Sequence, residues 1–124
     1  MGQGFRFKDR DPALSAAAQL DQTLAALADP YRRQAIERLR ERPYPAGELA
    51  RSMGLTPPAM SRHLRAMKQA GLVEETHPEF DARVRVYALK AGAIGLLLRW
   101  LQETEDMWSS QLSALKSHVE GKGL

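Results

Sequence analysis

The sequence of 124 residues predicts one mainly α-helical domain with a single small β-hairpin. Three observations support this fold class: two helix starts marked by proline, one alternating stretch typical of a half-buried strand, and long apolar helical segments near both ends. Apolar residues make up 44% and charged residues 27% of the chain, the balance of an ordinary globular protein. We expect residues 13–120 to form the domain, with 1–12 as a loose lead-in and 121–124 as a short tail.

The first two helices are predicted over residues 13–28 and 30–41. The first segment is rich in alanine and leucine and contains neither proline nor glycine. Asp29 and Pro30 then mark a helix start, because an aspartate accepts hydrogen bonds from free backbone N–H groups and a proline fits the first helical position. Two closely spaced prolines after the second segment end it.

Two further helices are predicted over residues 46–53 and 57–70, each followed by a glycine. Thr56 before Pro57 repeats the combination of a capping residue and a proline. Ala50 supplies a small side chain where two helices can cross closely. Two short helices joined by so tight a turn predict a helix-turn-helix.

Two strands are predicted over residues 72–77 and 83–89, joined by a loop. In the second segment three small or branched residues alternate with arginines and a tyrosine, so we expect Val84, Val86 and Ala88 to face the core. A strand, loop and strand after a helix-turn-helix indicate a winged helix. The expected order is therefore four helices, a hairpin and a last helix.

Positive charge is concentrated in one third of the chain. Residues 32–68 hold nine basic and three acidic side chains and carry +6, whereas the other 87 residues sum to −3. Such a segment favours a polyanionic partner, although solvated arginines alone would give the same count. On the fourth helix Met60, Leu64 and Met67 fall within an arc of about 60°, which predicts the buried face. The opposite face is basic.

That basic face fits the major groove of DNA. Arg62 is suited to hold the O6 and N7 atoms of guanine, and Ser61 suits a base edge or a phosphate. Arg65 and Lys68 are expected on phosphates, which add affinity without sequence information. His63 lies on the shoulder of the buried face, where packing on the second helix or a phosphate contact is favoured over base readout.

The second strand offers two more cations. Arg83 and Arg85 share one face and are expected to reach the minor groove or the DNA backbone, whereas Glu79 and Asp81 in the loop repel phosphate. The whole expected set for double-stranded DNA is Thr56, Pro58, Ser61, Arg62, His63, Arg65, Lys68, Arg83 and Arg85.

The last helix, predicted over residues 93–120, carries an apolar arc of about 200°, more than one small domain covers. One side is expected to pack on the chain's own core and the other on a second copy, the alternative being a monomer with a longer core. A two-fold dimer would place two recognition helices about 34–36 Å apart and implies a near-palindromic operator. Glu105 lies within the apolar stripe, where a salt bridge at the rim is favoured over a sensing role. The expected interface residues are Leu14, Leu24, Leu101, Trp108, Leu112 and Leu115.

Four ordered motifs carry a resemblance to a known family. They are Leu-Ala-Asp-Pro-Tyr-Arg-Arg at 27–33, Gly-Glu-Leu-Ala at 47–50, Pro-Ala-Met-Ser-Arg-His-Leu at 58–64 and Ala-Gly-Leu-Val-Glu at 70–74. Together with the hairpin at 83–89 they resemble the ArsR (arsenic-repressor) family of bacterial transcriptional regulators over roughly residues 15–120. The resemblance implies a homodimeric winged-helix repressor that releases operator DNA when an inducer binds. It also implies that Ser61 and Arg62 are among the DNA-reading residues.

The metal-binding residues of that family are not matched. Classical members carry cysteines where this chain has Gly47–Ala50, and a second family site would need ligands where this chain has Trp108, Val119 and Lys122. His118 misses its slot by one residue, which turns it about 100° away. We expect no metal and no cofactor. The inducer is left open as a small organic molecule, a protein or none.

Other functional classes lack support. The chain has no cysteine, which excludes disulfides, thiolate metal sites and cysteine nucleophiles. No apolar stretch approaches the roughly 20 residues that span a bilayer, so we expect a cytoplasmic protein without a membrane partner. No spacing of nucleophile and base and no phosphate-binding glycine loop indicates an enzyme. A winged-helix module that binds protein instead of DNA is the remaining alternative.

Overall fold

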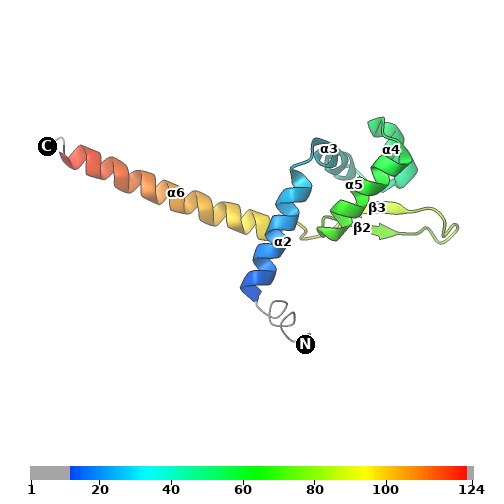
Figure 1. Ribbon diagram of the computed structural model, residues 1–124, viewed down its shortest axis with the longest axis horizontal. Helices are drawn as coiled ribbons and strands as arrows, with labels where there is room; N and C mark the ends of the chain where they lie inside the picture. The colour runs from blue at the N-terminus through cyan, green and yellow to red at the C-terminus, as the bar shows by residue number, and fades with distance from the viewer. Residues whose placement is uncertain (1–11, 123–124) are drawn as a thin grey trace, which may run out of the picture. The chain divides into compact units, whose positions relative to one another are not determined.

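The computed structural model describes residues 12–122 and divides into two units (Figure 1). The first unit extends to Ile94, and the second is the helix α6 (Gly95–Lys122). The predicted lead-in and tail lie outside the described residues, except that Pro12 begins the first helix and that α6 continues to Lys122.

The first unit contains the predicted helix-turn-helix and wing. The described helices are α2 (Pro12–Leu27), α3 (Pro30–Leu39), α4 (Ala46–Met53) and α5 (Pro57–Gln69), and the strands are β1 (Tyr44–Pro45), β2 (Val73–Thr76) and β3 (Val86–Leu89). The winged helix-turn-helix class is therefore confirmed. Strand β1 is an addition to the predicted hairpin, and the antiparallel sheet has the order β1-β3-β2.

Side chains cap the two helices that begin with proline, as predicted. The Asp29 carboxylate accepts hydrogen bonds from the backbone N–H groups of Tyr31 at 2.8 Å and Arg32 at 3.4 Å. Burial raises the pKa of Asp29, but these N–H groups outweigh it and hold the pKa below its ordinary value. The Thr56 hydroxyl oxygen accepts from the Ala59 N–H at 3.3 Å and caps α5 in the same way.

The turn between α4 and α5 fixes how the two helices cross. Gly54 adopts φ +67° at the end of α4, a conformation that glycine takes without strain. The N–H of Leu55 then donates to the Ala50 carbonyl at 2.9 Å, which turns the chain back toward α5. Arg38 of α3 donates to the Ser52 carbonyl at 3.0 Å and joins the end of α4 to the neighbouring helix.

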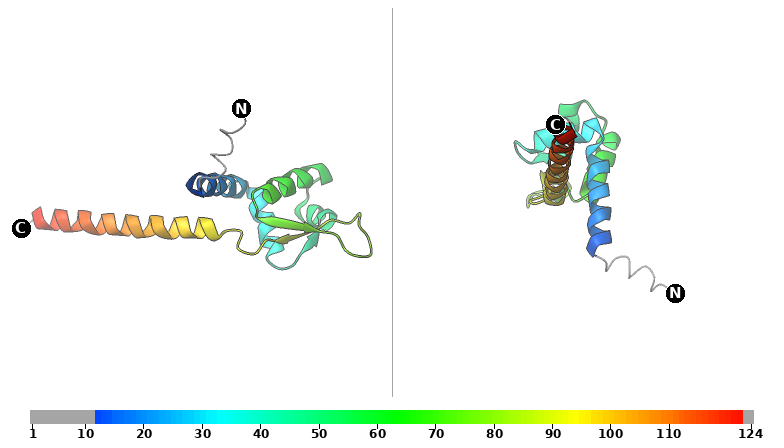
Figure 2. Two further views of the ribbon diagram at one scale, coloured as in Figure 1. Left: turned by 90° about the horizontal axis from the view of Figure 1, so that it is seen from below. Right: turned by 90° about the vertical axis from the view of Figure 1, so that its left-hand side faces the viewer.

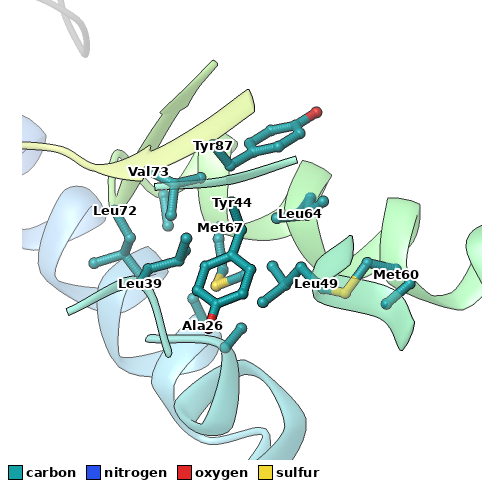
Figure 3. Close-up of a cluster of buried hydrophobic side chains, with 13 residues drawn as sticks. Ala26, Leu39, Tyr44, Leu49, Met60, Leu64, Met67, Leu72, Val73 and Tyr87 are labelled. Carbon is teal, nitrogen blue, oxygen red and sulfur yellow. The ribbon is translucent and has the colours of Figure 1, made fainter. Parts of the chain in front are cut away.

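The core lies between the helices and one face of the sheet (Figure 3). Met60, Leu64 and Met67 are each at most 2% exposed, so the predicted buried face of α5 is confirmed. Leu49 of α4 is fully buried against them. The sheet contributes Val73, and its register places Tyr87 opposite Glu75.

The predicted inward face of the second strand is wrong. Tyr87 is only 6% exposed, whereas Val84, Val86 and Ala88 are half-buried. The physical reason is the extra strand, because β1 pairs with the other edge of β3 and sets Tyr44 opposite Tyr87 over the core. A tyrosine also has an apolar ring to bury and a hydroxyl that can reach a polar partner.

The predicted second strand is also too long at its start. Arg83 and Arg85 precede β3 and lie in the loop between β2 and β3, which we call the wing loop (Figures 1 and 2). Asp81 causes this, because its side chain accepts the Arg83 N–H at 3.0 Å and its carbonyl accepts the Val84 N–H at 3.2 Å. These bonds form a local turn in place of strand pairing.

Helix α6 has 28 residues, about 42 Å, and begins two residues later than predicted. Most of its apolar side chains are exposed, among them Leu101 at 48%, Trp108 at 61%, Leu112 at 65% and Leu115 at 58%, whereas Leu96 and Leu97 are half-buried.

The remaining predicted interface residues lie in α2. Leu24 is 41% exposed, whereas its neighbours Thr23 and Ala26 are buried. Leu14 falls within α2, and its side chain lies outside the described residues. Helix α2 therefore has one face in the core and an exposed leucine beside that face.

Candidate nucleic-acid interface

The exposed side of α5 carries the predicted DNA-binding residues. Thr56, Pro58, Ser61, Arg62, Arg65 and Lys68 are all exposed, at the helix start or on the side away from the buried methionines. This placement follows from helical geometry, because side chains opposite a buried stripe must face solvent. The structure therefore brings this part of the set together on one helix.

Two arginines of this face are free of internal partners. Elsewhere in the basic segment, Arg40 donates to both oxygens of Glu37 at 3.1 and 3.2 Å, and Arg42 forms an ion pair with Glu48. Within residues 12–122, neither Arg62 nor Arg65 has an ion pair or a side-chain hydrogen bond. The acids of this segment thus neutralise arginines away from α5 and leave the α5 arginines available to an outside anion.

His63 is half-buried and packs on α3. Its ring lies 5.7 Å, centroid to centroid, from the ring of Tyr31, with 33° between the planes. The predicted packing of His63 on the second helix is therefore confirmed. Tyr31 is 47% exposed and lies beside α5. Tyr31 was not among the residues predicted from the sequence, although an aromatic residue in the first turn after a capped helix start was a visible signal.

Lys68 links the end of α5 to the wing. Its ammonium group lies 3.4 Å from one oxygen of Glu75 in β2, and the Tyr87 hydroxyl donates to the other oxygen at 2.5 Å. The Tyr87 hydroxyl is the main reason that the pKa of Glu75 lies below its ordinary value, with burial opposing and Lys68 assisting. Burial and the Glu75 carboxylate raise the pKa of Tyr87. We call Lys68, Glu75 and Tyr87 the helix–wing network.

A second basic feature lies where the start of α4 meets the wing loop. A hollow of about 360 Å³ is lined there by Arg51, Arg83 and Arg85, and also by Glu48, which is paired with Arg42. The Ala46 N–H donates to the Arg85 carbonyl at 3.0 Å and holds the two segments together. Arg51 was not among the residues predicted from the sequence, because only the fold brings α4 beside the wing loop.

The wing loop is less basic than its two arginines alone would make it. Arg83 lies 3.3 Å from Asp81, so part of its charge is neutralised within the loop. Phe80 is 88% exposed beside it, a large apolar side chain that the sequence argument did not single out. An aromatic residue between two acidic residues, Glu79 and Asp81, in a predicted loop was the available signal.

Two kinds of site are missing from the described part of the chain. Among residues 12–122 no three histidine, aspartate or glutamate side chains gather closely enough to hold a metal ion. No described helix is long and apolar enough to cross a membrane.

Comparison with known proteins agrees with this geometry. Residues 29–75 match the family described as bacterial regulatory protein, arsR family. The HTH-type transcriptional regulator NmtR of Mycobacterium tuberculosis is 40% identical over 76 residues, 59% of this chain and 63% of NmtR, so the match spans less than two thirds of that relative.

A second relative and a solved structure match over more of their length. The HTH-type transcriptional regulator Rv2034 of Mycobacterium tuberculosis is 32% identical over 103 residues, 83% of this chain and 91% of the relative. An ArsR-like transcriptional regulator from Rhodococcus sp. RHA1 superposes with a TM-score of 0.76 at 25% identity, covering 87% and 96% of the two chains. The fold is thus shared nearly end to end with a regulator.

The helix–wing network predicts a pH-dependent contribution to stability. Glu75→Gln should lower the free energy of unfolding at pH 7 by about 1 kcal/mol, because the amide loses the charge-assisted bonds to Tyr87 and Lys68. The pKa of Glu75 is depressed in the folded protein, so this advantage is present above the ordinary value of 4.5 and is lost as pH falls below it. Urea unfolding of both proteins across that range measures the difference.

Glu74→Gln is the matched control, because Glu74 is the exposed neighbour on the other face of β2. It should leave stability within about 0.5 kcal/mol of the parent. An effect of Glu75→Gln that is no larger than that of Glu74→Gln, or that is the same at every pH, would refute the role given to the network.

Proposed function

We propose that this chain, which belongs to the ArsR family of bacterial regulatory proteins, is a homodimeric repressor. It binds a near-palindromic operator in double-stranded DNA and releases the operator in response to a non-metal signal. Its relatives are transcriptional regulators and not enzymes. The observation that carries the proposal is the exposed side of α5, where Arg62 and Arg65 have no ion pair or side-chain hydrogen bond among the described residues. A bacterial repressor of this kind works in the cytoplasm, where the DNA is.

Each side chain of α5 has a role set by its position. Arg62 follows the first turn of the helix and is suited to a bidentate contact with guanine in the major groove. Arg65 lies one turn further along the helix than Ser61 and Arg62 and suits a phosphate. Ser61, Pro58 and Thr56 lie at the start of the helix and approach the DNA there.

The cations outside that face are assigned to the DNA backbone. Lys68 is held by Glu75, so its net contribution to phosphate binding should be smaller than that of Arg65. Arg51, Arg83 and Arg85 surround the hollow between α4 and the wing loop and suit a flanking phosphate. His63 contributes by packing on Tyr31 and keeping the start of α5 in place.

The spacing of apolar residues on α6 supports a dimer. From Leu98 to Val119 the positions alternate by three and four residues, the heptad spacing of a coiled-coil seam. All but one of these positions hold an apolar side chain that is 48–65% exposed. We call the apolar residues at these positions the α6 seam: Leu98, Leu101, Trp108, Leu112, Leu115 and Val119. Exposed leucines at this regular spacing fit a second copy of the same helix. The exception is Glu105, which accepts a hydrogen bond from the Ser109 hydroxyl at 3.3 Å.

The exposed leucine of α2 supports the same interface. Leu24 is 41% exposed on a helix whose other side is buried in the core. We propose that α2 extends the interface through Leu24 and Leu14. Two-fold symmetry would then set the two α5 helices at the repeat of the DNA and make the operator near-palindromic.

Replacing Arg62 and Arg65 by alanine, one at a time, separates base readout from phosphate contact. Arg62→Ala should weaken operator binding by about 1–3 kcal/mol and relax preference at the contacted base pair, because a bidentate contact is lost. Arg65→Ala should weaken binding to all sequences alike and reduce the slope of log K against log salt by about one. Titrations of operator and scrambled duplexes at several salt concentrations measure both effects.

The controls and contrary outcomes are specific. Arg99→Ala, a charge change on α6, should not alter base preference. If Arg62→Ala and Arg65→Ala both bind duplex DNA like the parent protein, the assigned face is wrong. If the parent protein itself binds no duplex, the fold serves a protein partner instead of DNA.

A charge in the α6 seam should disrupt the dimer. Trp108→Glu places a carboxylate at the centre of the apolar stripe, so sedimentation should show monomers at concentrations where the parent is dimeric. Ser110→Glu adds the same charge on the opposite side of the helix and should leave the dimer intact. If sedimentation gives Trp108→Glu and Ser110→Glu the same mass in solution, the α6 seam is not the interface.

A further inference from the structure

The first unit contains an apolar cavity that the DNA-binding proposal does not use. It has a volume of about 280 Å³ and lies at the end of the sheet opposite the wing loop. Its apolar walls come from three parts of the fold: α3, the start of β2 and the segment that follows β3. The residues are Ile36, Leu72, Leu89, Ala93 and Ile94.

The walls are held in place by backbone hydrogen bonds. The Lys90 N–H donates to the Leu72 carbonyl at 3.0 Å, which ties the segment after β3 to the residue before β2. The Ala93 N–H donates to the Lys90 carbonyl at 3.1 Å, and Gly92 between them adopts φ +74°. This tight turn forms one wall. Leu72 is 2% exposed, whereas Ile94 is 52% exposed, so the cavity has a buried wall and an open apolar edge.

Two cations line the same cavity, and none of its lining residues is acidic. Arg40, at the end of α3, is bound to Glu37. Lys90 has no ion pair or side-chain hydrogen bond within residues 12–122. An apolar interior beside an uncompensated ammonium group favours a ligand that is apolar at one end and anionic at the other.

The volume limits the size of such a ligand. A cavity of about 150 Å³ holds one benzene molecule, so 280 Å³ accommodates an aromatic ring or a short branched chain together with a carboxylate. It is too small for a nucleotide or a peptide helix.

We propose that this cavity is a binding site for a small organic acid, with the apolar part against Leu72, Leu89 and Ala93 and the carboxylate at Lys90. The site is independent of the DNA-binding face, because it shares no residue with it. Its test therefore requires no DNA and can fail while the proposed repressor function stands.

Benzoate is a suitable probe, and benzyl alcohol is its uncharged counterpart. The full chain is titrated with each at constant ionic strength, and ¹⁵N–¹H spectra are recorded. Benzoate should give saturable shifts centred on the amides of Leu89, Lys90 and Ala93. Benzyl alcohol should bind about fivefold more weakly, because it cannot pair with the ammonium group.

Two variants separate the site from general charge attraction. Lys90→Gln should weaken benzoate binding about fivefold, whereas Lys116→Gln on α6 should leave it unchanged. Ala93→Leu should fill the cavity and abolish saturable shifts. If Ala93→Leu does not fold, the Lys90 and Lys116 variants still decide the question.

Three results would overturn the proposal. One is the absence of saturable shifts, and another is equal binding by the Lys90 and Lys116 variants. The third is a set of shifts centred on Arg62 and Arg65, which would show simple attraction of an anion to the basic face. If cavity amides shift with protein concentration and benzoate has no effect, a second copy of the chain occupies the cavity and the ligand assignment is wrong.

Discussion

The burial of one side of α5 is the constraint on which the rest of the structure depends. Met60, Leu64 and Met67 are at most 2% exposed, and each such side chain contributes about 1.5–3 kcal/mol on leaving water. A rigid helix with one side fixed in the core has its other side fixed in solvent. The same burial that stabilises the domain therefore decides that Arg62 and Arg65 face outward.

The surrounding contacts convert that orientation into a defined surface. Leu49 and the close approach at Ala50 set the crossing of α4 and α5, and the helix–wing network joins the end of α5 to β2. The charges are arranged to the same effect. Ion pairs with Glu37 and Glu48 occupy Arg40 and Arg42, whereas Arg62 and Arg65 have no ion pair among the described residues.

Much of this could be predicted from the sequence because it depends on local rules. A capping residue before a proline placed the starts of α3 and α5, and the helical period gave the buried side of α5 without knowledge of the fold. The stripe on α6 was equally visible from spacing. These features need only the chain within about two helical turns.

What could not be predicted depends on contacts between distant segments. Strand β1 has two residues, too few to show a period, and its pairing with β3 reversed the expected inward face at Tyr87. The turn at Asp81 removed Arg83 and Arg85 from the strand, and the hollow beside Arg51 and the cavity beside Lys90 exist only once the chain is folded.

We propose that paired α5 helices read duplex DNA with the side opposite their buried residues. The most direct measurement is to incubate the purified protein with sheared genomic DNA from the organism that encodes it, recover the bound fragments and sequence them. We predict enrichment of fragments that share an inverted repeat whose half-site centres are about 10–10.5 base pairs, or a multiple of that, apart. Recovered fragments with the same composition as the input DNA would contradict the account.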